Sequence, residues 1–180
     1  MAFGEVGTSL SKIKANSLNL AGTFGFTGTV SGLADETPLV LLSTFTSDGS
    51  DATASFTSGI DSTYKEYQFH FIDIHPASNN VKLHFNMSAD SGSNYNVTKT
   101  TTFFRADHDE ADSATALGYN TSNDLAQSTN FQGLGDIGND NDQTLSGTLH
   151  LFNPSSTTFV KHFISKFNFT EYRALQITFI

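Results

Sequence analysis

The strongest constraint on the fold of this chain is the alternation of aromatic and polar side chains in EYQFHFIDI, residues 66–74. Successive side chains of an extended strand point to opposite faces, so Tyr67, Phe69 and Phe71 share one face. Polar residues, including His70, share the other face. A period of two is typical of a β-strand that buries one side, and it predicts that these rings belong to a core.

The same period recurs along most of the chain, between clusters of turn residues. Residues 37–46 are different, because their nearly continuous apolar run predicts a strand buried on both faces. The alternating segments, in which we expect the other strands, are residues 51–57, 80–89, 94–106, 143–154, 157–169 and 174–180.

These strands predict an all-β fold with one antiparallel β-sandwich, jelly-roll-like, over residues 37–180. The chain has 17 Phe residues, which can supply the core because each buried ring removes about 150–250 Å² from water. Phe85→Ala is expected to cost about 3–5 kcal/mol of stability and to prevent assembly. The predicted core residues are Phe69, Phe71, Leu83, Phe85, Leu149, Leu151 and Phe163.

Two polar stretches interrupt the strand pattern. Residues 106–124 are acidic and predict a long loop or one helical turn, and residues 132–143 carry the glycines and Asn-Asp pairs of a loop.

Residues 1–36 are expected to form an extended N-terminal arm that docks on a partner. Leu10 and Ile13 have helix-like spacing, so a short helix is the alternative for the first 20 residues. Residues 21–32 alternate small and apolar side chains between glycines. The first 20 residues have too few apolar side chains to hold themselves in place, so ordering on a partner is as well supported as the helix.

Composition argues against several classes of partner. The formal net charge is -9, with 9 Lys and Arg that do not cluster, whereas nucleic-acid and anionic-membrane binders need a basic patch. The absence of cysteine excludes disulfides and thiolate chemistry. The N-terminal residues lack the apolar core of a signal peptide, and no apolar run approaches the ~20 residues of a membrane span.

No set of residues predicts catalysis, a metal or a cofactor. His70, His84, His150 and His162 fall on the polar sides of strands, without the spacing of a metal site or a dependable carboxylate nearby. No nucleophile elbow, phosphate loop or calcium loop is present. We therefore expect a protein that is not an enzyme. A depolymerase-type hydrolase would need a repeated architecture, and no internal repeat is visible.

The alternative function is carbohydrate binding at a fibre tip, with a host surface glycan as partner. It would use the loops 106–124 and 132–143, with Tyr119, Asn120 and Asp124. The lack of Trp and the core-like alternation of the Phe residues argue against exposed sugar platforms on the strands.

The segments SGIDSTY (58–64), NYNVTKTTTFFR (94–105) and LHLFNPSS (149–156) resemble a family of tailed-phage virion structural proteins, of the marine or cyanophage type. The similar region spans residues 39–164, and residues 9–32 resemble the amino-terminal repeats of phage fibre and appendage proteins. The resemblance implies a non-enzymatic β-sandwich on the virion surface, as a tail fibre or a capsid decoration protein. It supplies no site residues.

From this resemblance we expect localisation to the virion, with assembly in the host bacterial cytoplasm, docking on other virion proteins through the arm, and a homotrimer. Family members continue for several strands beyond the segment FVKHFI, residues 159–164, whereas only 16 residues follow here. Either this short tail supplies the closing strand, or a neighbouring subunit covers an open edge. We expect the neighbour, because an unpaired edge promotes association.

Overall fold

The computed structural model describes residues 39–171 and 175–178. These residues form strands and loops, with no helix among them. The strands are β1 (Glu66–Ile74), β2 (Val81–Phe85), β3 (Phe104–Asp109), β4 (Thr115–Tyr119), β5 (Gln132–Ile137), β6 (Leu145–Phe152), β7 (His162–Thr170) and β8 (Leu175–Thr178). All of their pairings are antiparallel, which confirms the predicted all-β class and strand direction.

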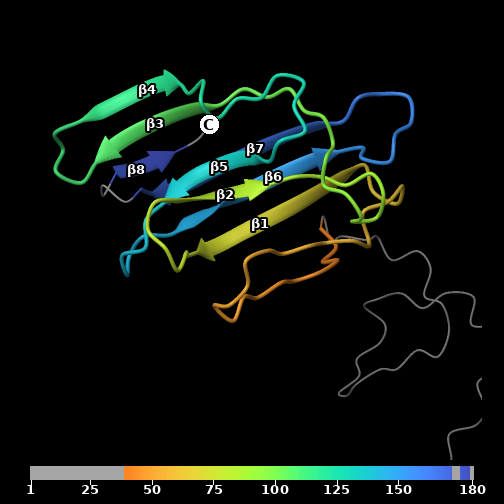
Figure 1. Cartoon of the computed structure of the whole chain (residues 1–180), viewed down its shortest axis with the longest axis horizontal. Coiled ribbons are helices and arrows are strands. Elements are labelled where there is room, and N and C mark those ends of the chain that lie inside the picture. Colours follow the sequence, from red (N-terminus) through yellow and green to blue (C-terminus); the bar gives the residue numbers. More distant parts are fainter. Residues whose placement is uncertain (1–38, 172–174, 179–180) are drawn as a thin grey trace, which may run out of the picture. The chain divides into compact units, whose positions relative to one another are not determined.

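The strands form two sheets of unequal size (Figure 1). The larger one has six strands in the order β1-β6-β7-β8-β3-β4, and the smaller one pairs β2 with β5. A bulge between Phe71 and Ile74 interrupts the pairing of β1 with β6, and Asp73 has a positive φ of 50° there.

The small sheet packs on β7 of the large sheet. Phe85 of β2 meets Phe163 of β7 edge to face, with ring centroids 5.0 Å apart. Gly135 of β5 lies against the ring of Phe169. The core between the sheets is closed by nine buried side chains: Tyr67, Phe103, Leu134, Ile137, Leu145, Leu149, Leu151, Phe167 and Phe169.

The predicted core residues all lie in or against this core. Leu149 and Leu151 are buried, and the other five are half-buried and pack against the buried cluster. The period-two reading of β1 is confirmed, because Tyr67 is buried while Glu66 and His70 are exposed.

Both predicted loops contain strands, so these expectations were wrong. Residues 106–124 include the last four residues of β3 and all of β4, which form a hairpin. Residues 132–143 begin with β5, which is almost entirely buried. Its glycines are used for close packing rather than for turning, since a Cβ on Gly135 would collide with Phe169.

The strands predicted within residues 37–46 and 51–57 do not form among the described residues. Leu39, Val40, Leu41 and Leu42 are exposed instead of buried on both faces. The segment from residue 41 to 57 passes beside β1 without entering its sheet (Figure 1). The rings of Phe56 and Phe69 meet edge to face, with their centroids 5.9 Å apart. An apolar run becomes a buried strand only when another layer covers it, and no described element covers this one.

The short C-terminal tail provides a strand inside the sheet. β8 pairs with β7 through Asn168↔Thr178 and with β3 through Ala106↔Thr178. The tail therefore supplies a strand, which is the alternative to the expected neighbour, and among the described strands β1 and β4 are the outer ones of the large sheet. Covering of an edge by a neighbouring subunit stays a prediction. The predicted arm, residues 1–36, lies outside the described residues.

Candidate functional site

A groove of about 300 Å³ opens at one end of the large sheet. One wall is formed by residues 100–104, which lead into β3, and the other by residues 161–167 of β7 and the turn before it. Residues 132–134 of β5 line it as well, from the second layer.

The groove results from the position of β8. This strand separates β7 from β3 only between Asn168–Thr170 on one side and Ala106–Asp109 on the other. Figure 1 shows that β8 spans only one end of the much longer β7. Beyond it, the groove walls face each other, and no described strand lies between them. The groove therefore lies in line with β8, at a position of the sheet that no strand fills among the described residues.

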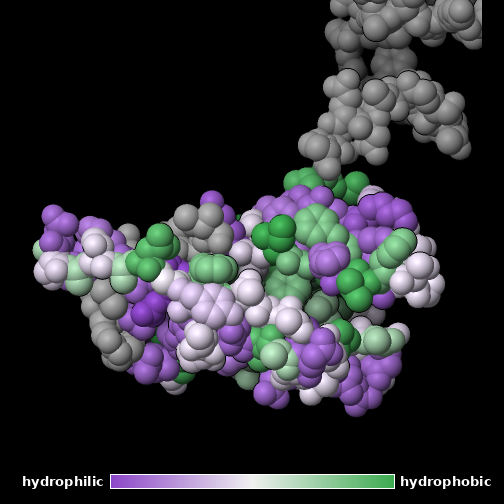
Figure 2. All heavy atoms as spheres, turned by 90° about the horizontal axis from the view of Figure 1, so that it is seen from above, coloured by the Kyte–Doolittle hydropathy of each residue, from purple (hydrophilic) through white to green (hydrophobic). Residues whose placement is uncertain are grey.

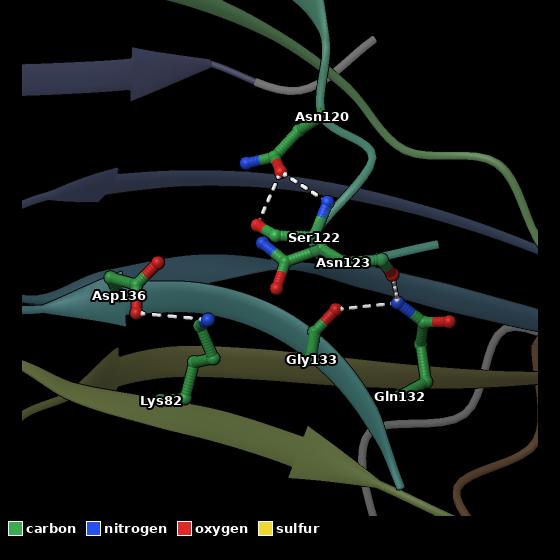
Figure 3. A network of polar contacts seen from close by, with 7 residues as sticks. All are labelled: Lys82, Asn120, Ser122, Asn123, Gln132, Gly133 and Asp136. Atoms are coloured by element: carbon green, nitrogen blue, oxygen red, sulfur yellow. Dashed lines mark hydrogen bonds and ion pairs between the residues drawn. The ribbon is translucent and has the colours of Figure 1, made fainter. Parts of the chain in front are cut away.

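Gln132 fixes the base of the groove by using both ends of its buried amide (Figure 3). Its Nε2 donates to the carbonyl oxygens of Asn123 at 2.7 Å and Gly133 at 2.8 Å. Its Oε1 accepts a hydrogen bond of 2.6 Å from Thr101 Oγ1, which itself accepts from the N–H of Leu125. These hydrogen bonds join the groove wall at Thr101 to β5, which forms the base of the groove. They also give the buried amide of Gln132 a partner for both its nitrogen and its oxygen.

Two further contacts in Figure 3 support the small sheet and the loop after β4. Lys82 Nζ lies 3.5 Å from Asp136 Oδ1, across the β2–β5 pair. Ser122 donates from its backbone N–H and its Oγ to Asn120 Oδ1, at 3.1 and 2.7 Å. Both are half-exposed or exposed contacts, which contribute little stability individually.

The charged or titratable residues that line the groove are Lys161 and His162, and no carboxylate is among the lining residues that the structure describes. The other lining residues are threonines, apolar side chains, Gln132, Gly133 and Ser165. The groove is suited to binding an extended chain through its backbone and apolar side chains.

Sequence reasoning missed the buried Lys99. Its Nζ donates to Asn86 Oδ1 at 2.5 Å and to the carbonyl oxygen of Val97 at 2.8 Å. Burial lowers the pKa of Lys99 below its usual value, because desolvation disfavours the charged form. The signal was present, since period-two alternation puts Lys99 on the same face as Val97, Thr101 and the buried Phe103.

The four strand histidines lie on four different strands, β1, β2, β6 and β7. Within residues 39–171, no three His, Asp or Glu side chains gather closely enough to hold a metal ion. The expectation that no carboxylate accompanies them was wrong for His150, whose Nδ1 is 2.6 Å from Glu66 Oε1. This hydrogen bond holds the pKa of Glu66 below its ordinary value.

The residues proposed for carbohydrate binding are partly brought together. Tyr119 Oη donates to Asp124 Oδ2, which raises the pKa of Tyr119. The ring of Tyr119 also meets Phe104 edge to face at 5.2 Å, and both rings are exposed. Asn120 instead uses its side-chain oxygen on Ser122. The second loop of that hypothesis does not join them as a loop, because residues 132–137 form β5.

Comparison with family models, curated proteins and solved structures finds no match for this chain. The resemblance to phage virion proteins therefore stays a prediction. The part of the chain that the structure describes contains no helix of the length and apolarity needed to cross a membrane.

Proposed function

We propose that this chain is a non-enzymatic structural protein of a phage particle, a tail fibre or capsid decoration component, that acts by assembly. The observation that carries the proposal is the apolar surface left uncovered in the described residues. Leu39 to Leu42 are four consecutive exposed apolar residues, and Leu41 is 82% exposed. Contiguous exposed apolar side chains commonly mark an interaction site, whereas single exposed apolar side chains are ordinary on a protein surface.

A second set of exposed apolar side chains lies beside the groove. Phe159, Val160 and Ile164 are all more than half exposed. Figure 2 shows hydrophobic groups separated by hydrophilic ones on the face in view. Apolar side chains scattered in this way support several subunit contacts better than one deep ligand site.

The finer parts of the proposal come from the sequence resemblance. They are the jelly-roll character of the sandwich, attachment to other virion proteins through residues 1–36, a homotrimer, and a place on the virion surface. The six-plus-two sheet arrangement agrees with a sandwich in having two packed layers. Closed point-group symmetry is the common outcome when identical subunits associate.

Two matched leucines test the proposal. Leu41→Asp should lower incorporation of the labelled protein into purified particles by about tenfold or more, the loss expected when one buried leucine contact is removed. Leu117→Asp is the control, because Leu117 is 81% exposed but lies on β4, in a different segment of the chain from the apolar run. Normal incorporation of the Leu41→Asp protein would reject the role of the run. Density for the chain nowhere on reconstructed virions would reject the function.

The second candidate function is glycan binding at the exposed pair of Phe104 and Tyr119. An aromatic face next to an acceptor such as Asp124 is the arrangement that a sugar ring needs, apolar on one side and hydrogen-bonding at the edge. A glycan array compares the wild type with Tyr119→Ala, with Phe159→Ala as an exposed-aromatic control. Glycan binding lost only in Tyr119→Ala would establish this function, and an array without binding would reject it.

A further inference from the structure

We propose that the groove between β7 and residues 100–104 receives a β-strand from the N-terminal arm of a second copy of this chain, within residues 21–32. The inference deepens the proposed assembly function and rests on it. It names the surface that joins subunits and the segment that fills it. Three features support it: the register of the groove walls, the polarity of the two faces of the gap, and the residue pattern of the arm.

The register places the two walls as the flanks of a missing strand. Thr178 of β8 lies between Ala106 of β3 and Asn168 of β7. Extending this register three and four residues back along both flanks sets Phe103 opposite Ser165 and Thr102 opposite Ile164, and all four residues line the groove. Both flanks run in the same direction, because each is antiparallel to β8. A strand entering in line with β8 would pair antiparallel with both.

The backbone of one wall is oriented for this pairing. The N–H groups of Lys99 and Thr101 donate toward residues 128 and 125, away from the groove, at 2.8 Å each. Alternate residues of a strand bond to opposite neighbours, so Thr100 and Thr102 direct their backbone groups into the groove. Paired backbone groups are the main source of affinity when a strand is added to a sheet.

The two faces of the gap differ in polarity. Toward the second layer, an incoming side chain would meet the buried Phe103 and Phe167, with Leu134 of β5 as the floor. On the other face it would lie between the exposed Thr102 and Ile164. The gap therefore selects a strand that is apolar at every second position and small or polar between them.

Residues 21–32, AGTFGFTGTVSG, match this requirement. In an extended chain Phe24, Phe26 and Val30 share one face, and Thr23, Thr27 and Thr29 share the other. The segment has no charged residue. The groove lining has no carboxylate, so it does not favour a basic strand over an uncharged one. Uncharged alternation of this kind pairs readily with an open sheet position.

Donation to a neighbour follows from the assembly function on which this inference rests. A segment that filled the gap of its own subunit would link no subunits, whereas an exchanged segment does. The 23 residues between the segment and Phe56 are long enough to reach the gap of either copy, so the crosslink within or between chains decides between them.

The chain contains no cysteine, so engineered disulfides report this contact without background. Two full-length proteins with different affinity tags, Thr102→Cys and Thr27→Cys, are co-expressed and oxidised, and a second mixture uses Thr29→Cys to allow for the strand register. We expect a covalent heterodimer that carries both tags in one of these mixtures. Leu117→Cys with Thr27→Cys is the control and should give a small fraction of this product, because Leu117 is also exposed but lies on β4, outside the groove lining.

Three results would overturn the inference. One is the absence of the two-tag product. Another is equal yield from the control. The third is a disulfide found only within one chain when Thr102→Cys and Thr27→Cys are combined in the same molecule, which would mean that a subunit fills its own gap. Light scattering of the wild-type protein distinguishes failure of the strand exchange from failure of the proposed assembly function. Oligomers without the crosslink would reject the strand exchange alone, and a monomer without it would reject self-assembly too.

Discussion

Gly135 of β5 lies directly against the ring of Phe169 of β7, at the contact between the two sheets. A Cβ placed on Gly135 would come within 2.6 Å of Phe169 Cε1 and 2.8 Å of Cδ1. Real Cβ atoms do not approach a ring this closely, so the absence of a side chain sets the spacing of the layers. The same glycine belongs to the stretch that the sequence predicted to be a loop.

Gly135→Ala should therefore destabilise the domain by about 1–3 kcal/mol, the usual cost of forcing extra volume into a packed interior. Urea unfolding followed by circular dichroism measures the change. Gly118→Ala is the matched control on β4, because a Cβ there meets no atom within 4 Å, and it should stay within about 0.5 kcal/mol of the wild type. Equal stability of all three proteins would contradict the packing of β5 on β7.

Phe167→Ala should cost about 3–5 kcal/mol, because Phe167 is only 2% exposed in the core and its removal leaves a cavity. Phe159→Ala, on a ring that is 70% exposed, should change the free energy of unfolding by less than about 0.5 kcal/mol. Phe85→Ala should fall between them, below the cost expected from the sequence alone, since Phe85 is half-buried against Phe163. Thermal or urea unfolding of the three variants gives the order, and a reversed order would reject the core assignment.

Gln132→Met should lower stability by about 1–3 kcal/mol, because it leaves the buried carbonyl groups of Asn123 and Gly133 without their donor. Hydrogen exchange should also quicken at the N–H of Thr101, whose wall loses its link to β5. Gln68→Met on β1 serves as the control, because the side-chain amide of Gln68 bonds the exposed Glu66 and is not part of the groove wall. Unchanged exchange at Thr101 would mean that Gln132 does not fix the groove wall.

Asp90 gives a pH-dependent prediction. Hydrogen bonds from Ser88 Oγ and from the backbone and side chain of Asn94 lower the pKa of Asp90 from 3.8 to about 2. A carboxyl group whose folded pKa lies below its unfolded value stabilises the fold when ionised. This contribution is fully present above pH 3.8 and is lost as the pH falls through about 2.

Carboxyl NMR should place the titration midpoint of Asp90 near 2. Asp90→Asn should be less stable than the wild type at pH 5, and the difference should shrink as the pH falls toward 2. A midpoint near 3.8, or a stability difference that does not change with pH, would show that these hydrogen bonds do not persist in solution.

The period-two segments predicted much of the fold. β1, β2, β6 and β7 form where Tyr67, Leu83, Leu149 and Phe163 alternate with polar residues, and β8 forms within the last alternating segment. Here local pattern and tertiary burial agree. The candidate residues Tyr119 and Asp124 are five residues apart in the sequence, and this closeness allows the hydrogen bond between them.

The groove could not be predicted from the same pattern. Its walls, residues 100–104 and 161–167, are far apart in the chain, and they become flanks of one gap only because β8 pairs with both strands. Gln132 was assigned to a loop, because its neighbours are glycines whose local preference is a turn. Burial beneath β7 overrides that preference.

The amino-acid sequence by itself determined that this chain forms antiparallel sheets with aromatic and leucine side chains inward, because side-chain alternation is a local property of extended backbone. Only the tertiary structure decided which apolar segments are covered. Leu39 to Leu42 are as apolar as the core strands and stay exposed, whereas the glycine-rich β5 is buried. The physical reason is that burial depends on what another element places opposite a segment, and a residue's own hydrophobicity does not contain that information.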